Sequence, residues 1–195
     1  MKLLFLLSLS LLLLLLLLQS SLFIFNFAEI FAEQLLKSAT DFKVYQNKNH
    51  SFELMYPLNW TYIEFQDQFF DIDLNVVASF ISPLNSSLDA FQEYFTIKTK
   101  MLDPKDTFSS HFELYLEKLK NSIANITISK VEDISDTNKY LTYSFSPQPG
   151  LVINKNEYIL LNTDNKIFHI EFNSNNNDKA FGSLINKIVS HFRVI

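Results

Sequence analysis

Four histidines are the residues best suited to acid–base or metal chemistry in this sequence: His50, His111, His169 and His191. A metal site or a general base needs two of them, or one with carboxylates, at one place in the fold. His111 and Glu113 are two residues apart on a predicted helix, which puts them on different faces. His169 lies beside Glu171 on a predicted strand. We therefore interpret all four as ordinary surface or edge histidines, and predict no catalytic residue and no metal ligand.

Two other sequence patterns bear on metal binding and catalysis. Asp71, Asp73 and Asn75 match positions 1, 3 and 5 of a calcium-binding loop, but position 6 should be glycine and is Val76, and position 12 should be glutamate and is Ser82. The Gly-x-Ser-x-Gly motif of many hydrolases does not occur. Catalytic triads are assembled in space, so a hydrolase stays an alternative that requires a histidine near a serine or carboxylate in a cleft.

The composition excludes further kinds of site. There is no cysteine, which removes thiol catalysis, cysteine-based metal sites and disulfides, so packing alone must hold the fold. Only two glycines occur, Gly150 and Gly182, which excludes a glycine-rich phosphate loop. The net charge is −5 without a cluster of basic residues, a poor match to a nucleic-acid backbone. We predict no cofactor and no nucleic-acid partner.

An apolar segment at the N-terminus predicts membrane targeting. Residues 3–28 contain no charged side chain, and about 20 apolar residues in a helix span a bilayer core of ~30 Å. Lys2 precedes this segment, whereas Glu29 and Glu33 follow it, which predicts that the rest of the chain lies outside. Cleavage stays open, because the candidate sites lack a small residue at one of the two required positions. The expected organisation is a signal peptide or signal-anchor helix (1–28), a stalk (29–40) and one domain (41–195), membrane-anchored and facing outside or secreted.

Hydrophobic periodicity predicts that this domain is α+β. Alternating apolar residues predict strands at 42–44, 52–56, 60–65, 74–81, 91–102, 126–131, 140–145, 157–161 and 167–172. A 3.6-residue spacing predicts a helix over 107–123, with Ser110 and Glu113 as its capping box, and a closing helix after Asp178. Residues 173–177 are predicted as a polar loop. Strands grouped around two helices favour an antiparallel sheet of about six or more strands flanked by helices.

The segment Tyr56-Pro57 to Trp60 is the most distinctive local motif. Proline lacks an amide hydrogen, so Pro57 is predicted to end its strand. Trp60 is interpreted as a core residue, and ligand stacking is the alternative.

Four Asn-x-Ser/Thr sequons begin at Asn49, Asn59, Asn85 and Asn125. Asn49, Asn85 and Asn125 are possible glycosylation sites of an exported domain. Asn59, next to Trp60, is interpreted as a turn residue.

Several stretches resemble one protein family. Residues 52–60 are similar to the family's strand followed by a Tyr-Pro-x-x-Trp motif. Val76–Pro83 is similar to a strand of the family that ends in Ser-Pro. Glu157–Phe172 and Ile188–Phe192 are similar to its terminal hairpin and helix with a Ser-x-Phe ending. Over about residues 41–195 the chain thus resembles the PsbP-like family, which includes the extrinsic lumenal protein of photosystem II and exported archaeal and bacterial domains. The resemblance implies an α/β/α sandwich and an assembly or stabilising role without catalysis. No family binding position aligns residue by residue, so none is carried over.

The leading hypothesis is therefore an exported or membrane-anchored, non-catalytic PsbP-like domain that binds and stabilises or assembles a membrane-associated protein complex. The first alternative is an extracytoplasmic carrier or sensor of a small apolar ligand, suggested by the twenty phenylalanines and eight tyrosines. It requires an open cavity of several hundred Å³. A cryptic hydrolase is the second alternative.

Overall fold

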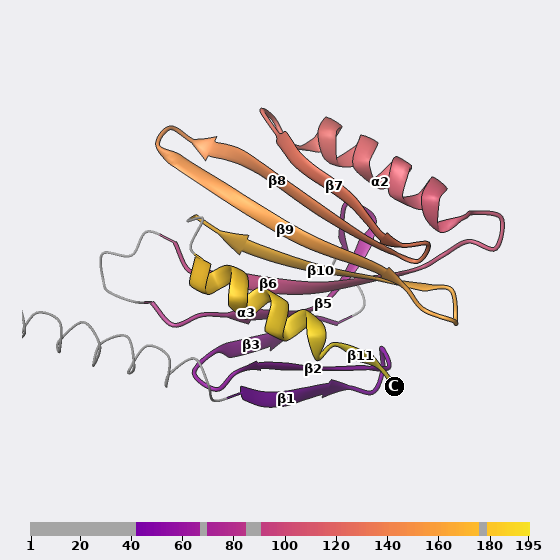
Figure 1. Cartoon of the computed structure of the whole chain (residues 1–195), viewed down its shortest axis with the longest axis horizontal. Coiled ribbons are helices and arrows are strands. Elements are labelled where there is room, and N and C mark those ends of the chain that lie inside the picture. The colour runs from indigo at the N-terminus through magenta and orange to yellow at the C-terminus, as the bar shows by residue number, and fades with distance from the viewer. Residues whose placement is uncertain (1–41, 67–69, 85–90, 176–178) are drawn as a thin grey trace, which may run out of the picture. The chain divides into compact units, whose positions relative to one another are not determined.

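From Phe42 onward, the part of the chain that the structure describes consists of strands and two helices (Figure 1). The computed structural model describes residues 42–66, 70–84, 91–175 and 179–195. In chain order the elements are β1 (Phe42–Asn47), β2 (Phe52–Pro57), β3 (Thr61–Glu64), β4 (Phe70–Asp71), β5 (Leu74–Ile81), β6 (Tyr94–Met101), α2 (Phe108–Ser122), β7 (Thr127–Ser135), β8 (Asn138–Gln148), β9 (Leu151–Leu161), β10 (Lys166–Ser174), α3 (Lys179–Ser190) and β11 (Arg193–Val194).

The predicted N-terminal hydrophobic helix (1–28) and stalk (29–40) lie outside the described residues. Within those residues, no helix combines the length and apolar character needed to cross a membrane.

One large antiparallel sheet forms the centre of the domain. Seven strands follow one another in the order β3-β5-β6-β10-β9-β8-β7, and β4 pairs with β5 beside this path. A smaller sheet has the order β1-β2-β11. The strands β7 to β10 form the predicted meander, in which each strand pairs with the next along the chain. The structure confirms the α+β class and an antiparallel sheet of more than six strands.

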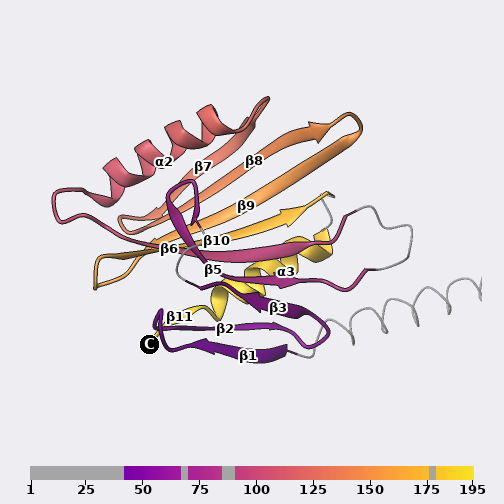
Figure 2. The same cartoon turned by 180° about the vertical axis from the view of Figure 1, so that it is seen from behind.

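The two helices cover opposite faces of the large sheet (Figures 1 and 2). Alternation along β10 explains this, because Phe168, Ile170 and Phe172 belong to one core, whereas Ile167 belongs to the other. Helix α3 contributes Ile185 and Ile188 to the first core, which also includes the inner side chains of β2. Helix α2 supplies apolar residues to the second core, namely Phe108, Phe112, Tyr115 and Leu119. This arrangement is the expected α/β/α sandwich.

The start of helix α2 differs from the predicted capping box. Thr107 is the N-cap, and its hydroxyl accepts a hydrogen bond from the Ser110 amide at 3.1 Å. The Ser110 hydroxyl in turn accepts from the Thr107 amide at 2.9 Å. Ser110 is therefore the third helical residue rather than the cap, and the predicted pairing with Glu113 is wrong. The helix begins three residues earlier than that pairing requires.

The Tyr56–Trp60 motif has the predicted structural role. Strand β2 ends at Pro57, and the Trp60 amide donates to the Pro57 carbonyl at 3.0 Å. Trp60 is buried, with its ring centroid 5.9 Å from that of Phe95, and Tyr56 is buried 4.8 Å from Phe80. Asn59 lies in the intervening turn, as expected.

Strand β10 continues beyond its predicted end. Asn173 and Ser174, predicted as loop, are buried strand residues. Asn173 pairs with Tyr94 on β6 and with Lys155 on β9, so the sheet on both sides extends the strand despite its polar side chain. The short strands β4 and β11 were not predicted, because two residues carry no detectable alternation.

Replacing Trp60 with alanine should lower the free energy of unfolding by about 3–5 kcal/mol, because it leaves a large void in the core. The matched control is Val44→Ala, at an exposed position, which should stay within about 0.5 kcal/mol of wild type. Urea unfolding followed by far-ultraviolet circular dichroism measures both, since Trp60 is the sole tryptophan and fluorescence is lost with it. An equally small effect at both positions would contradict a core role.

Candidate functional site

The structure brings two of the four histidines together and leaves the other two apart from them. His50 and His191 are partly exposed, in the β1–β2 turn and after α3. His111 and His169 are both buried, and their Nε2 atoms are 3.4 Å apart. The prediction of ordinary surface or edge histidines is therefore wrong for this pair. Sequence spacing missed it because the two residues belong to a helix and a strand 58 positions apart.

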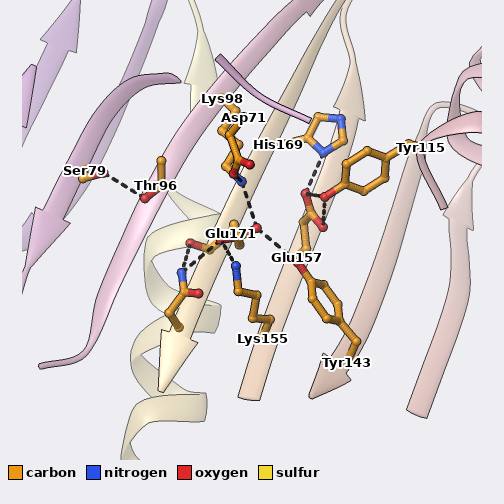
Figure 3. Close-up of polar contacts among 11 residues, drawn as sticks. Asp71, Ser79, Thr96, Lys98, Tyr115, Tyr143, Lys155, Glu157, His169 and Glu171 are labelled. Atoms are coloured by element: carbon orange, nitrogen blue, oxygen red, sulfur yellow. Dashed lines mark hydrogen bonds and ion pairs between the residues drawn. The ribbon is translucent and has the colours of Figure 1, made fainter. Parts of the chain in front are cut away.

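His169 is the centre of a buried hydrogen-bond network, defined here as the histidine network: His111, Tyr115, Glu157 and His169. The His169 Nδ1 atom is 2.6 Å from Glu157 Oε1, and both side chains are fully buried. The Tyr115 hydroxyl lies 2.9 Å from each oxygen of the same carboxylate. Its ring also packs edge-on against the imidazole, with centroids 4.6 Å apart. Helix α2, which carries Tyr115 and His111, is thus joined to strands β9 and β10 by polar contacts (Figure 3).

A second network surrounds Glu171 and is called here the lysine network: Asp71, Lys98, Tyr143, Lys155, Glu171 and Asn173. Lys155 Nζ lies 2.7 Å from one carboxylate oxygen of Glu171, and Lys98 Nζ lies 2.9 Å from the other. Lys98 also pairs with Asp71 at 2.6 Å, and the Tyr143 hydroxyl donates to Glu171 at 3.2 Å. The Asn173 amide donates to Glu171 at 3.2 Å. Strands β6, β8 and β9 therefore meet β10 at one carboxylate, and β4 is linked to it through the Asp71–Lys98 pair.

Strand register explains why the two networks adjoin. Glu157 on β9 lies directly opposite Glu171 on β10, and both face the side of the sheet that α2 covers. Like charges in this position destabilise a sheet unless each is compensated. Two lysines compensate Glu171, whereas His169 and Tyr115 bind Glu157 (Figure 3). The cluster is a pair of opposed carboxylates, each held by its own partners.

The surroundings shift the pKa values of these groups. Lys98 and Lys155 hold the pKa of Glu171 far below its usual range, against the opposing effect of burial. Glu171, Glu157 and Asp71 raise the pKa of Lys98, although burial acts in the opposite direction. Burial, with the nearby His169, Lys100 and Lys118, lowers the pKa of His111 to about 4.

The tyrosines of both networks are kept neutral. Burial, together with the negative charge of nearby carboxylates, raises the pKa values of Tyr115 and Tyr143 well above the ordinary value. Each hydroxyl can therefore donate a hydrogen bond to its carboxylate. In this arrangement the buried ions and the neutral hydroxyls stabilise one another.

The Asp71–Asn75 motif is not a calcium loop in the structure. Ile72 and Asp73 form the two-residue turn between β4 and β5, with φ of 50° and 65°. Asp71 pairs with Lys98, and Asp73 pairs with Lys118 of α2. Among the described residues, no group of three or more histidine, cysteine, aspartate or glutamate side chains is placed to hold a metal ion.

Two of the three predicted glycosylation sites lie on the described surface. Asn49 is exposed in the β1–β2 turn, and Asn125 is exposed between α2 and β7. Asn85 lies outside the described residues.

The fold is shared with several solved structures, although in sequence the chain matches neither a protein family nor a curated protein. It is similar to PsbP (CyanoP) from Synechocystis sp. PCC 6803, with a TM-score of 0.56 and 11% identity over 79% of this chain and 92% of that one. The Ran-binding protein Mog1p of Saccharomyces cerevisiae gives a TM-score of 0.53 and 11% identity, covering 79% and 95%.

LpqN of Mycobacterium tuberculosis, described as involved in cell envelope biogenesis, gives a TM-score of 0.51 and 12% identity, covering 78% and 89%. These likenesses define the class of the domain: it has the PsbP-like/Mog1 fold, as the sequence motifs suggested. At such low identity they concern the fold alone.

Replacing Glu171 with glutamine should lower the free energy of unfolding at pH 7 by about 3 kcal/mol or more, because two buried lysines lose their counter-charge. The folded-state pKa of Glu171 is depressed, so its contribution is present above the unfolded value of about 4.3 and is lost as pH falls below it. Urea titrations at pH 7 and pH 3 should therefore show the gap between wild type and variant narrowing in acid. Glu132→Gln, which breaks an exposed pair with Lys130, should have little effect. Equal effects of the two substitutions would contradict a structural role for the lysine network.

Acid should weaken the fold through His111. Its folded-state pKa of about 4 lies below the unfolded value of about 6.5, so the unfolded chain takes up the proton first and stability falls between these values. Between pH 7 and pH 4, wild type should lose on the order of 2–3 kcal/mol more than His111→Gln. At pH 8 His111 is neutral in both the folded and the unfolded chain, so the difference in unfolding free energy between wild type and variant there reflects packing alone. If the free energies of unfolding of the two proteins fall in parallel as the pH is lowered, His111 does not contribute to the acid sensitivity of the fold.

Proposed function

We propose that this protein is a non-catalytic protein-binding domain, tethered to a membrane by residues 3–28 and facing outside, that stabilises or assembles a membrane-associated protein complex. The apolar segment after Lys2 and the acidic residues that follow it support export and orientation. The leader is either retained as the anchor or removed by cleavage, and the mass of the native N-terminus distinguishes the two. The PsbP-like/Mog1 fold, together with a surface of the large sheet rich in tyrosine and asparagine, supports a protein-binding role.

One surface carries the binding proposal and is called here the open face: Lys130 and Glu132 of β7, Tyr140, Thr142 and Ser144 of β8, and Asn154, Asn156 and Tyr158 of β9. Strand register places these residues on the side of the sheet opposite to α2. Helix α3 packs over β10 on that side and reaches the edge of this surface at Tyr158, which packs against the first core and whose hydroxyl donates to Asn186 of α3 at 3.5 Å. Strands β7 and β8 extend past the helix (Figure 1).

The open face has the composition of a protein-binding surface. The Tyr140 and Tyr158 rings lie 4.7 Å apart, and Lys130 lies over the Tyr140 ring at 5.4 Å. The Tyr140 hydroxyl donates to Asn156 at 2.7 Å. Tyrosines supply rigid contact area at low entropic cost, and Asn, Ser and Thr supply adaptable hydrogen bonds, as in antibody paratopes. Tyrosine is also enriched among residues that dominate binding energy.

The buried networks support a non-catalytic role. A hydrolase requires a histidine beside a carboxylate in a cleft, and His169 with Glu157 meets the first condition. Both side chains are fully buried, and their hydrogen bonds go to each other, to Tyr115 and to His111. A substrate would have to displace α2 to reach them.

The aromatic content is used for packing, which argues against the carrier alternative. Phe80 and Phe95 stack at 4.4 Å, and Phe95 contacts Phe172 at 5.3 Å. Tyr45 packs edge-on against Phe80 at 5.1 Å. These rings fill the space between the two sheets. Among proteins of the same fold, Mog1p is described as Ran-binding, which agrees with binding through this scaffold without identifying a partner here.

The test uses two neighbouring residues of β7 that face opposite sides. Lys130 contacts Tyr140 on the open face, whereas Val131 pairs with Leu141 of the second core and faces the other side. With a photo-reactive side chain placed at either position in native membranes, cross-links to larger proteins should form from position 130 and not from position 131.

The double variant Lys130→Ala/Tyr140→Ala should reduce recovery of the cross-linked or co-migrating complex by at least about tenfold, since a buried tyrosine anchor is commonly worth more than 1.4 kcal/mol. Val131→Ala is its matched control. Wild-type protein that migrates only as a free monomer, or a complex unaffected by the double variant, would overturn the proposal.

A further inference from the structure

Strand β7 forms one margin of the large sheet (Figures 1 and 2). Within the described part of the chain it pairs with β8 and with no other strand, so its outer edge has no strand beside it. All of its residues except Ile128 are exposed. An exposed edge of this length is a template for pairing with a further strand. The residues of β7 therefore decide which strand fits there.

Two irregularities confine the regular part of β7 to its centre. The register with β8 shifts on both sides of residues 130–133, so that Ser129 and Ile134 have no register partner on β8. Between the shifts, residues 130–133 pair regularly with residues 139–142. Bulges bend and twist an edge away from a neighbouring strand. A strand added to β7 is therefore restricted to this central segment.

The central segment is complementary to a second copy of itself. When two β7 strands run antiparallel about a twofold axis at Val131, Lys130 of each copy lies directly opposite Glu132 of the other. Both side chains are about half exposed and lie on the open face, so each opposed pair joins unlike charges. Moving the axis by one residue opposes two Lys130 or two Glu132 side chains, which is unfavourable. Charge order thus selects one register.

The other edge strands of the described part of the chain lack this property. Strands β1 and β3 each carry one charged residue, Lys43 and Glu64, so neither can oppose unlike charges with its own copy. Strands β4 and β11 have only two residues each. Val44 on β1 is more exposed than Val131, at 64% against 46%. The order of charges, and not exposure, therefore distinguishes β7.

We propose that two copies of this chain pair through antiparallel β7 strands and form a dimer with one continuous large sheet. The contact uses both β7 edges, so association through it ends at the dimer. The twofold axis is perpendicular to the sheet, which puts the two open faces side by side on the same surface. Because the regular segment is short, the interface belongs to the small, dissociable class. The inference depends neither on the tether nor on the partner of the proposed function.

The chain contains no cysteine, so a single cysteine on the twofold axis tests the register. Position 131 faces its own copy, with Cβ atoms expected about 5 Å apart, so a short bifunctional thiol reagent should join two copies of the full-length Val131→Cys variant in detergent. Val44→Cys is the matched control, an exposed valine on another edge strand. The product of twice the chain's mass should form at least about fivefold more from position 131 than from position 44. Its mass distinguishes it from cross-links to larger proteins.

Charge reversal tests the pairing itself. Lys130→Glu and Glu132→Lys each oppose like charges, and each should weaken dimerisation of the full chain in detergent by at least about tenfold, measured by sedimentation. A mixture of the two single variants should form a heterodimer. The double variant Lys130→Glu/Glu132→Lys should dimerise as wild type does. Both combinations restore unlike charges at every opposed pair, and recovery of dimer from the mixture shows that both single variants are folded.

The outcomes separate this inference from the proposed function, because no partner is present in these measurements. Wild-type chain that stays monomeric up to about 0.1 mM would overturn the dimer. Dimers that neither single variant weakens would also overturn it, since they form elsewhere, as through residues 3–28. Single variants that dissociate but do not associate when mixed would contradict the charge pairing on which the register rests.

Discussion

Two carboxylates, Glu157 and Glu171, face each other across the central strands of the sheet, and the rest of the domain is arranged to compensate them. Lys98 and Lys155 reach Glu171 from strands on either side of it, and His169 reaches Glu157 from the neighbouring strand. Burying an ion without its partner is strongly unfavourable, so strand order and register are coupled to charge pairing. The apolar cores supply most of the driving force, and the polar cluster links strands β4, β6, β8, β9 and β10 through compensated charges.

The histidine and lysine networks lie beneath α2, where their side chains are engaged with each other. The proposed binding role therefore uses the surface of the sheet and not these networks. The Tyr- and Asn-rich open face on β7 to β9 is a part of the large sheet that α2 does not cover and that α3 covers only in part, and we propose that it binds the protein partner.

The sequence predicted the architecture more completely than the site. Strand and helix positions follow from local alternation, so the order of elements, the role of Pro57 and the burial of Trp60 could be predicted from the chain itself. The polar residues of β10 could not be placed this way. His169 and Glu171 alternate with phenylalanine and isoleucine, which is the pattern of a half-exposed strand, but β10 is central and covered on both faces.

The pairing within the site depends on distant partners. Tyr115 and Glu157 are 42 residues apart, and Lys98 and Glu171 are 73 residues apart. No local spacing rule relates such positions. A charged residue at a core-facing strand position could have served as a signal, but only once the register of the neighbouring strands was known.

The central claim is that the buried charges have a structural role and take no part in binding the partner. Its most direct test replaces the heart of the lysine network by apolar side chains of similar size, as Lys98→Met, Lys155→Met and Glu171→Met together, and measures partner complex formation in the folded variant. Buried ion clusters can often be exchanged in this way without loss of stability. The account predicts a folded protein that still assembles with its partner; a variant that folds normally but no longer forms the complex would contradict it.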